Sequence, residues 1–184
     1  MYETTVAALG KVFGPTDDGI FHATTPLGFG GGADVKAYRM PAGGVAYATA
    51  GLIESEDQPP NAMGRYELAV CRPQGDQTWP VSMVSCIAGY AMRTPLEPWD
   101  TMPVPADLPE GATLTDLLFV PYAVFEVDGR PCGVILCLGL TEAELRYCQT
   151  VDCEPVIERL TAAGEYPFTN PTRESVVLAD GRLA

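Results

Sequence analysis

Six cysteines and one histidine are the side chains of this sequence that could hold a metal ion or act in catalysis. The cysteines are Cys71, Cys86, Cys132, Cys137, Cys148 and Cys153. Two pairs, Cys132 with Cys137 and Cys148 with Cys153, are spaced somewhat like zinc ligands. The first pair falls on one predicted strand, which points its thiols to opposite faces, and the second straddles a junction between predicted helices. Buried free thiols are therefore preferred, and we predict neither a metal site nor a cofactor.

The histidine, His22, would need a positioned serine or cysteine beside it to activate a nucleophile. It lies in an N-terminal stretch with little predicted structure, and the sequence has no GxSxG elbow. The glycine run at 28–32 lacks the strand, the helix and the GK[ST] of a phosphate-binding loop, which indicates a linker. We therefore predict no catalytic residue. A cysteine- or metal-dependent enzyme, or a zinc-binding protein, is kept as the alternative.

Clustered carboxylates and the two tryptophans suit binding better than catalysis. Glu54, Glu56 and Asp57 are close together in a predicted loop. They are either a solvated run of charges or a surface that recognises a basic peptide. Trp79 and Trp99 are expected in the core, or, if exposed, as interface anchors. These five residues are the predicted partner-binding residues.

Composition narrows the class of protein. The chain has 184 residues, of which 47% are hydrophobic, enough for one domain with a core. Its net charge of -13 repels phosphate backbones, so nucleic-acid binding is not predicted, and it favours a basic partner or serves solubility alone. The start of the sequence, with Glu3 and no sustained apolar run, is not expected to be a secretory signal, and no run approaches roughly 20 apolar residues. A cytoplasmic protein without a membrane span or disulfides is expected.

Residues 64–92 are predicted to be the structural centre. Apolar and polar residues alternate over 65–70, the period of a half-buried strand. Within it, Glu67 would face the wetter side of a sheet or pair with Arg65 or Arg39.

The uncharged stretch 79–92 that follows predicts a helix that is buried or covered by a partner. If one face of this helix is open, that face would be a binding site.

The remaining pattern supplies the other elements. Helices are expected over 2–13, from Thr141 onward and from Asp152 to 163; at Thr141, Glu144 completes a capping box. Strands are expected over 35–40, 45–50, 117–127, 132–140 and 174–178. A turn is expected at 17–19 and a proline-rich loop over 94–113. A single compact domain over 1–184 is expected, in which 1–34 is a helix and irregular lead-in and 35–178 is the core.

Taken in order, these motifs resemble the Suppressor-of-Fused family, specifically its N-terminal domain and bacterial stand-alone versions. The matching segments are VAYATAGL at 45–52, GRYELAV at 64–70, TWP at 78–80, GVILCLGLTEAEL at 133–145 and the segment around Arg173. Together they cover about residues 35–178.

The resemblance implies a mixed α+β fold, with a central, mainly antiparallel sheet and helices packed on it. It also implies a binding protein rather than an enzyme. Animal members repress zinc-finger transcription factors by clamping a peptide between two domains, and a second domain is not expected in a chain of this length. Bacterial relatives are regarded as immunity proteins that neutralise a toxin. The expected function is therefore a non-enzymatic protein-interaction domain, such as an immunity protein for a basic toxin. A homodimeric scaffold without a client is a further alternative.

Overall fold

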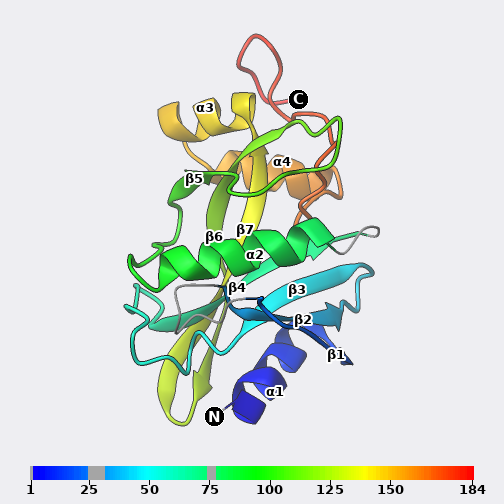
Figure 1. Cartoon of the computed structure of the whole chain (residues 1–184). Helices are drawn as coiled ribbons and strands as arrows, with labels where there is room; N and C mark the ends of the chain where they lie inside the picture. The colour runs from blue at the N-terminus through cyan, green and yellow to red at the C-terminus, as the bar shows by residue number, and fades with distance from the viewer. Residues whose placement is uncertain (1, 25–31, 74–77) are drawn as a thin grey trace.

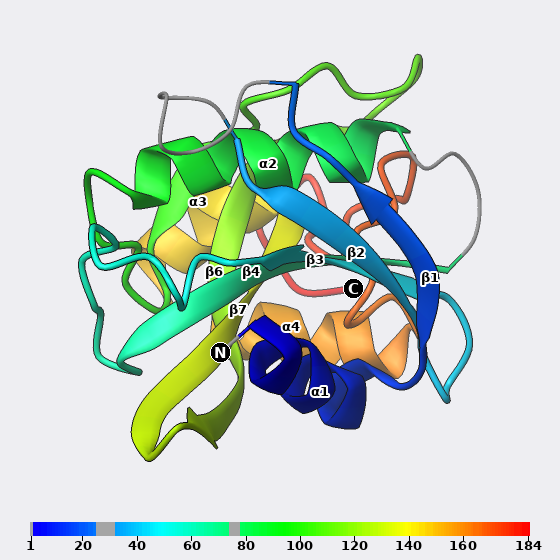
Figure 2. The same ribbon diagram turned by 60° about the horizontal axis from the view of Figure 1, so that its bottom comes forward.

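In the computed structural model, which describes residues 2–24, 32–73 and 78–184, a seven-stranded sheet carries helices on both faces (Figures 1 and 2). The strands are β1 (Thr16–Phe21), β2 (Asp34–Arg39), β3 (Val45–Ala50), β4 (Arg65–Arg72), β5 (Thr101–Pro103), β6 (Leu114–Val127) and β7 (Arg130–Thr141). The helices are α1 (Tyr2–Phe13), α2 (Thr78–Ala91), α3 (Glu142–Thr150) and α4 (Glu154–Ala162). The strand order is β1-β2-β3-β4-β7-β6-β5. Among the seven strands in the described part of the chain, only β4 and β7 pair with one another in parallel, so the predicted mainly antiparallel α+β fold is confirmed.

β7 lies in the interior of the sheet, between β4 and β6, and is buried on both faces. Ile135 and Cys137 face the core beneath α2, whereas Val134 and Leu136 face the core beneath α1 and α4. Figure 2 shows α2 on one side of the sheet and α1 and α4 on the other. A strand covered by helices on both sides can be apolar at every position, which accounts for the continuous run GVILCLGL.

β4, the neighbour of β7, is also buried on both faces, so the prediction of a half-buried strand is wrong. Leu68 and Val70 contact the core under α2, while Ala69 faces the opposite core. Glu67 is 0% exposed and pairs with neither Arg65 nor Arg39. The alternation in the sequence reflects one buried carboxylate rather than a solvated face.

α2 presents one face to the sheet and one to solvent. Met83, Val84 and Ile87 are fully buried against β3 and β4. Cys86 and Tyr90 are exposed, Tyr90 by 48%. The helix therefore has an open, uncharged face, where a groove of about 490 Å³ runs past Ser82, Cys86 and Tyr90.

Three local predictions are wrong, each because a tertiary contact decides the structure. The expected turn at 17–19 lies within β1, an edge strand that pairs with β2. The proline-rich segment 94–113 contains β5, an edge strand, where proline is tolerated. Residues 174–178 are not a strand and make only an isolated bridge between Val177 and Leu183.

The C-terminal segment is fixed instead by one buried ion pair. Arg173 is 4% exposed, and its Nη1 donates to Oε1 of Glu144 at 2.6 Å while its Nη2 donates to Oε2. Nη2 also donates to the Gly139 carbonyl at 2.9 Å. Glu144 completes the capping box of α3 by accepting from the Thr141 N–H, as predicted, and accepts from the Val176 N–H as well. A single carboxylate thus joins the end of β7, the start of α3 and the C-terminal segment.

Candidate protein-interaction surface

The loop between β3 and β4, residues 51–64, is held at its start by the buried carboxylate of Glu67. This carboxylate accepts hydrogen bonds from the Thr49 hydroxyl at 2.6 Å, the Gly51 N–H at 3.0 Å and the Ile53 N–H at 3.1 Å. Burial raises the pKa of Glu67 to about 7, although the hydrogen bonds favour its ionised form. The Glu67 carboxylate therefore fixes the backbone where the loop leaves β3.

The middle of the same loop is fixed by Gln58, which is 1% exposed. Its amide Nε2 donates to the Tyr66 carbonyl at 2.8 Å, and its Oε1 accepts from the Tyr66 N–H at 3.2 Å. The pairing of β3 with β4 ends at Ala48 and Ala69, before it reaches Tyr66, so Gln58 supplies the two bonds that a strand neighbour would make. The exposed carboxylates of Glu56 and Asp57, which we call the acidic tip of the loop, are consequently presented on a preorganised backbone.

Replacing Gln58 with alanine is expected to lower the free energy of unfolding by about 1–3 kcal/mol, because two buried backbone groups of Tyr66 lose their partners. Urea-induced unfolding followed by tryptophan fluorescence measures this change. Gln149, which is exposed on α3, is the matched control, and its replacement by alanine should change stability by less than about 0.5 kcal/mol. Equal stability of the two variants would contradict the role of Gln58.

A second loop, residues 94–100, lies beside the first. The Asn61 amide donates to the Leu96 carbonyl at 2.7 Å, and the Ala62 N–H donates to the Glu97 carboxylate at 3.2 Å. Figures 1 and 2 both show the two loops next to one another, beyond the C-terminal end of α2. Two stretches far apart in the sequence thus form one end of the molecule.

Trp99 is the prominent apolar side chain of the second loop. It is 49% exposed, and its backbone has a φ of 75°, a left-handed conformation that costs a bulky residue roughly 1–3 kcal/mol. The loop is fixed to β6 by two hydrogen bonds, from the Trp99 N–H to the Phe119 carbonyl at 2.7 Å and from the Phe119 N–H to the Asp100 carbonyl at 2.9 Å. A strained and exposed tryptophan on a fixed backbone is a candidate interface anchor.

The structure brings most of the predicted partner-binding residues to this end. Glu56 and Asp57 are exposed on the first loop, Glu54 is half-buried at its base, and Trp99 is exposed on the second. We call the set Glu56, Asp57, Glu97, Trp99 and Asp100 the two-loop surface. Trp79 does not belong to it.

Trp79 is 5% exposed and packs in the core under α2, so it lacks the exposure that an anchor needs. The guanidinium of Arg72 lies 4.9 Å from the centroid of its ring. This contact stabilises the start of α2 against β4.

A cavity of about 260 Å³ opens beside the first loop. Ile53 and Pro60 line it from the loop, and Val127 and Pro131 line it from the β6–β7 hairpin. Its walls are mainly apolar, and Arg65 and Arg130 also line it.

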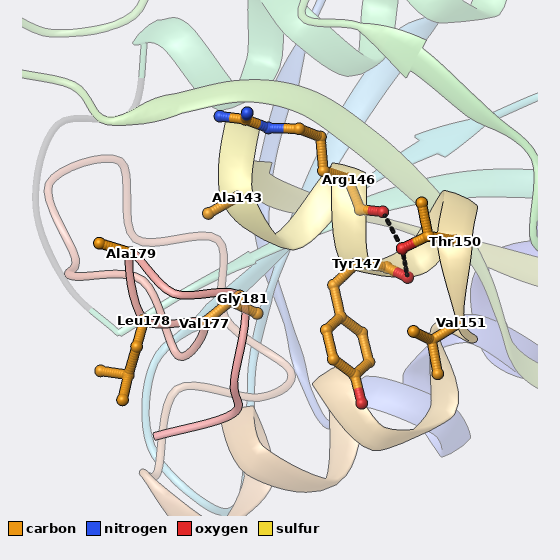
Figure 3. A pocket seen from close by; sticks show the side chains of 9 residues that line it. All are labelled: Ala143, Arg146, Tyr147, Thr150, Val151, Val177, Leu178, Ala179 and Gly181. Atoms are coloured by element: carbon orange, nitrogen blue, oxygen red, sulfur yellow. Dashed lines mark hydrogen bonds between the residues drawn. The ribbon is translucent and has the colours of Figure 1, made fainter.

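A second cavity, of about 310 Å³, lies between α3 and the C-terminal segment (Figure 3). Tyr147 and Val151 line one side, and Leu178 lines the other. Arg146, at its rim, makes an exposed ion pair with Glu142 at 3.1 Å. The cavity holds no pair of catalytic groups.

The residues considered for catalysis and metal binding do not form such a site in the described part of the chain. His22 is exposed and pairs with Asp34 at 2.9 Å, and all six cysteines are free. Among residues 2–24, 32–73 and 78–184, no three histidine, cysteine or acidic side chains gather as metal ligands. The glycines at 28–31 lie outside the described residues, and Gly32 precedes β2.

Gln58, Asn61 and Glu67 hold the two loops in place. Sequence reasoning missed Gln58 and Asn61, and it noted Glu67 but gave it the wrong partners. The one available signal was Glu67, a charged residue inside a strand whose neighbours are apolar. Gln58 and Asn61 look like ordinary loop residues, and only their tertiary partners reveal them.

Solved structures share this fold, among them the following three. A SUFU homolog from Neisseria gonorrhoeae superposes with a TM-score of 0.72 at 16% identity, covering 96% of this chain and 97% of that one. A structure of the Sufu–Fu complex gives a TM-score of 0.72 at 18% identity, covering 94% and 90%. Drosophila Suppressor of Fused gives 0.62 at 16% identity over 80% of this chain, which spans 44% of that protein. The curated proteins contain no match to this sequence.

The mainly antiparallel sheet, covered on both faces and bearing two joined loops at one end, defines an α+β domain with the fold of these structures. The family of the Suppressor of fused protein (SUFU) matches residues 32–174, most of the chain. The chain therefore belongs to the SUFU family. None of the described helices is long and apolar enough to cross a bilayer.

Proposed function

We propose that this chain is a non-enzymatic binding protein whose two-loop surface contacts a basic protein. The proposed partner is a toxin that the chain neutralises in the cytoplasm as an immunity protein. Neutralisation would be steric: the acidic tip and Trp99 cover the partner's functional surface, and the charge of the chain speeds encounter.

The observation that carries this proposal is the preorganisation of the surface. Glu67, Gln58 and Asn61 fix its backbone before any partner arrives. A surface that is ordered in advance loses less conformational entropy on binding. The net charge of -13 adds long-range attraction for a cationic partner.

The experiment is affinity capture of partners from the native host by the wild-type chain and by Trp99→Gly. Glycine removes the anchor and also relieves the positive φ, so the variant should remain about as stable as the wild type. Loss of an anchor should weaken binding by at least about 30-fold, the equivalent of roughly 2 kcal/mol. A basic protein recovered by the wild type and lost in Trp99→Gly supports the proposal.

Reversing one charge of the two-loop surface separates long-range electrostatic attraction from direct contact with the partner. Asp57→Lys should slow association and reduce its dependence on salt, measured by surface plasmon resonance on the captured partner. Glu142→Lys, at an exposed position of α3, is the matched control. This variant should bind the partner as the wild type does.

Two outcomes would overturn the proposal. If Tyr90→Ser rather than Trp99→Gly abolishes capture, the binding site is the open face of α2. If no partner is recovered, light scattering shows only a homodimer, and a deletion strain has normal toxin sensitivity, the chain is a scaffold without a client.

A further inference from the structure

Cys148 and Cys153 lie together at the junction of α3 and α4. Cys148 is in the last turn of α3, and Cys153 is the N-cap residue of α4, the position that the sequence had assigned to Asp152. Both thiols are half-buried against the same apolar cluster, and they share a hydrogen bond. The spacing that resembled a metal site thus places two thiols in contact.

The two thiols are not equivalent. The hydrogen bond from Cys148 lowers the pKa of the Cys153 thiol, and the same bond raises the pKa of Cys148. The side chain of Cys153 makes no capping hydrogen bond at the start of α4, so its contact with Cys148 is what distinguishes it from an ordinary thiol. The pair therefore contains one thiol suited to attack a disulfide and one placed beside it to resolve the product.

The surroundings of the Cys148–Cys153 pair differ from those of the other cysteines. Cys71 and Cys137 are fully buried in the sheet, and Cys132 is 2% exposed. Cys86 is exposed on α2, and its sulfur contacts the Pro105 carbonyl rather than a second thiol.

We propose that Cys148 and Cys153 are a reversible modification site that exchanges with a small-molecule disulfide of the glutathione type to form an internal disulfide. The Cys153 thiolate attacks one sulfur of the small disulfide, which releases one small thiolate and leaves a mixed disulfide. Cys148 then loses its proton to solvent and attacks the Cys153 sulfur, which releases the second thiolate. The two protein thiols lose two electrons and two protons, and the small disulfide is reduced to two thiols.

The connection between the helices can accommodate this bond. The sulfurs must close to about 2.05 Å. The linking residues Val151 and Asp152 are exposed, so the core does not fix their side chains, whereas α4 is held in the core by Val156 and Leu160. Val151 and Tyr147 of the same segment line the cavity in Figure 3, so oxidation would alter one wall of that cavity.

The test uses the full chain carrying Cys86→Ser, which removes the exposed thiol. The folded protein is incubated with glutathione disulfide, alkylated, and digested with trypsin. Cleavage after Arg146 and Arg159 gives one peptide, 147–159, that contains both cysteines. We expect this peptide to become two hydrogens lighter, to carry no glutathione, and to return to its original mass with dithiothreitol.

A second variant identifies the order of the steps. Cys148→Ser should accumulate glutathione on Cys153, because the resolving thiol is missing. The proposal is overturned if Cys86→Ser protein retains glutathione on either thiol without forming the internal bond. It is also overturned if both thiols stay unmodified in the folded protein but react once urea unfolds it.

Discussion

Replacing Arg173 with leucine is expected to lower the free energy of unfolding by roughly 3–5 kcal/mol, because it leaves the Glu144 carboxylate buried without its counter-ion. Burial alone would raise the pKa of Glu144, but the hydrogen bonds and charge of Arg173 lower it overall. The loss should be measured by urea-induced unfolding at neutral pH, where the carboxylate of the wild type is ionised.

Two further variants show whether geometry or charge is responsible. Arg173→Lys keeps the charge but loses the two-pronged contact, so its stability should lie between those of the wild type and Arg173→Leu. Arg182, whose pair with Asp180 is exposed, is the matched control, and Arg182→Leu should cost less than about 0.5 kcal/mol. An equal loss in both leucine variants would show that the ion pair does not join the C-terminal segment to α3.

Replacing Glu67 with glutamine is expected to change how stability depends on pH. The folded-state pKa of Glu67 is raised to about 7, above its value in the unfolded chain. Its stabilising contribution is therefore complete below about pH 4 and is lost as pH rises through 7. Glutamine does not ionise, so Glu67→Gln should gain on the order of 3 kcal/mol relative to the wild type between pH 4 and pH 8.

The measurement is the difference in unfolding free energy between the wild type and Glu67→Gln at several pH values. The contributions of the other carboxylates cancel in this difference because both proteins contain them. Glu126, exposed near the end of β6, provides the control, because Glu126→Gln should show a nearly constant difference. A flat profile for Glu67→Gln would mean that Thr49, Gly51 and Ile53 fully offset the cost of burying the charge.

Much of the fold follows from local signals in the sequence. Asp128-Gly129 predicts the β6–β7 hairpin because both residues must adopt positive φ, and they do, at 50° and 73°. Thr141 and Glu144 predict the start of α3 through a contact that spans only three residues. In such places neighbouring residues decide the structure, so the sequence is sufficient.

The parts that could not be predicted depend on partners distant in the chain. β1 forms over Asp17 and Gly19, residues typical of turns, because β2 offers an open edge. The strand expected at 174–178 gives way to the contacts of Arg173 and Glu144, which no local pattern encodes. The same holds for the candidate site, since Glu56 and Trp99 were identified by type but their joining depends on the contact of Asn61 with Leu96.

The parallel pairing of β4 with β7 also has a consequence for how the chain folds. Arg65 lies opposite Cys132, so this pairing must wait until α2, β5 and β6 have been synthesised. The hairpins β2–β3 and β6–β7 can form from local contacts, whereas joining the two halves requires the closure of a long loop. Until that step, one edge of β4 lacks a neighbour on the growing chain and can pair with other chains, which makes association before completion the principal folding hazard of this topology.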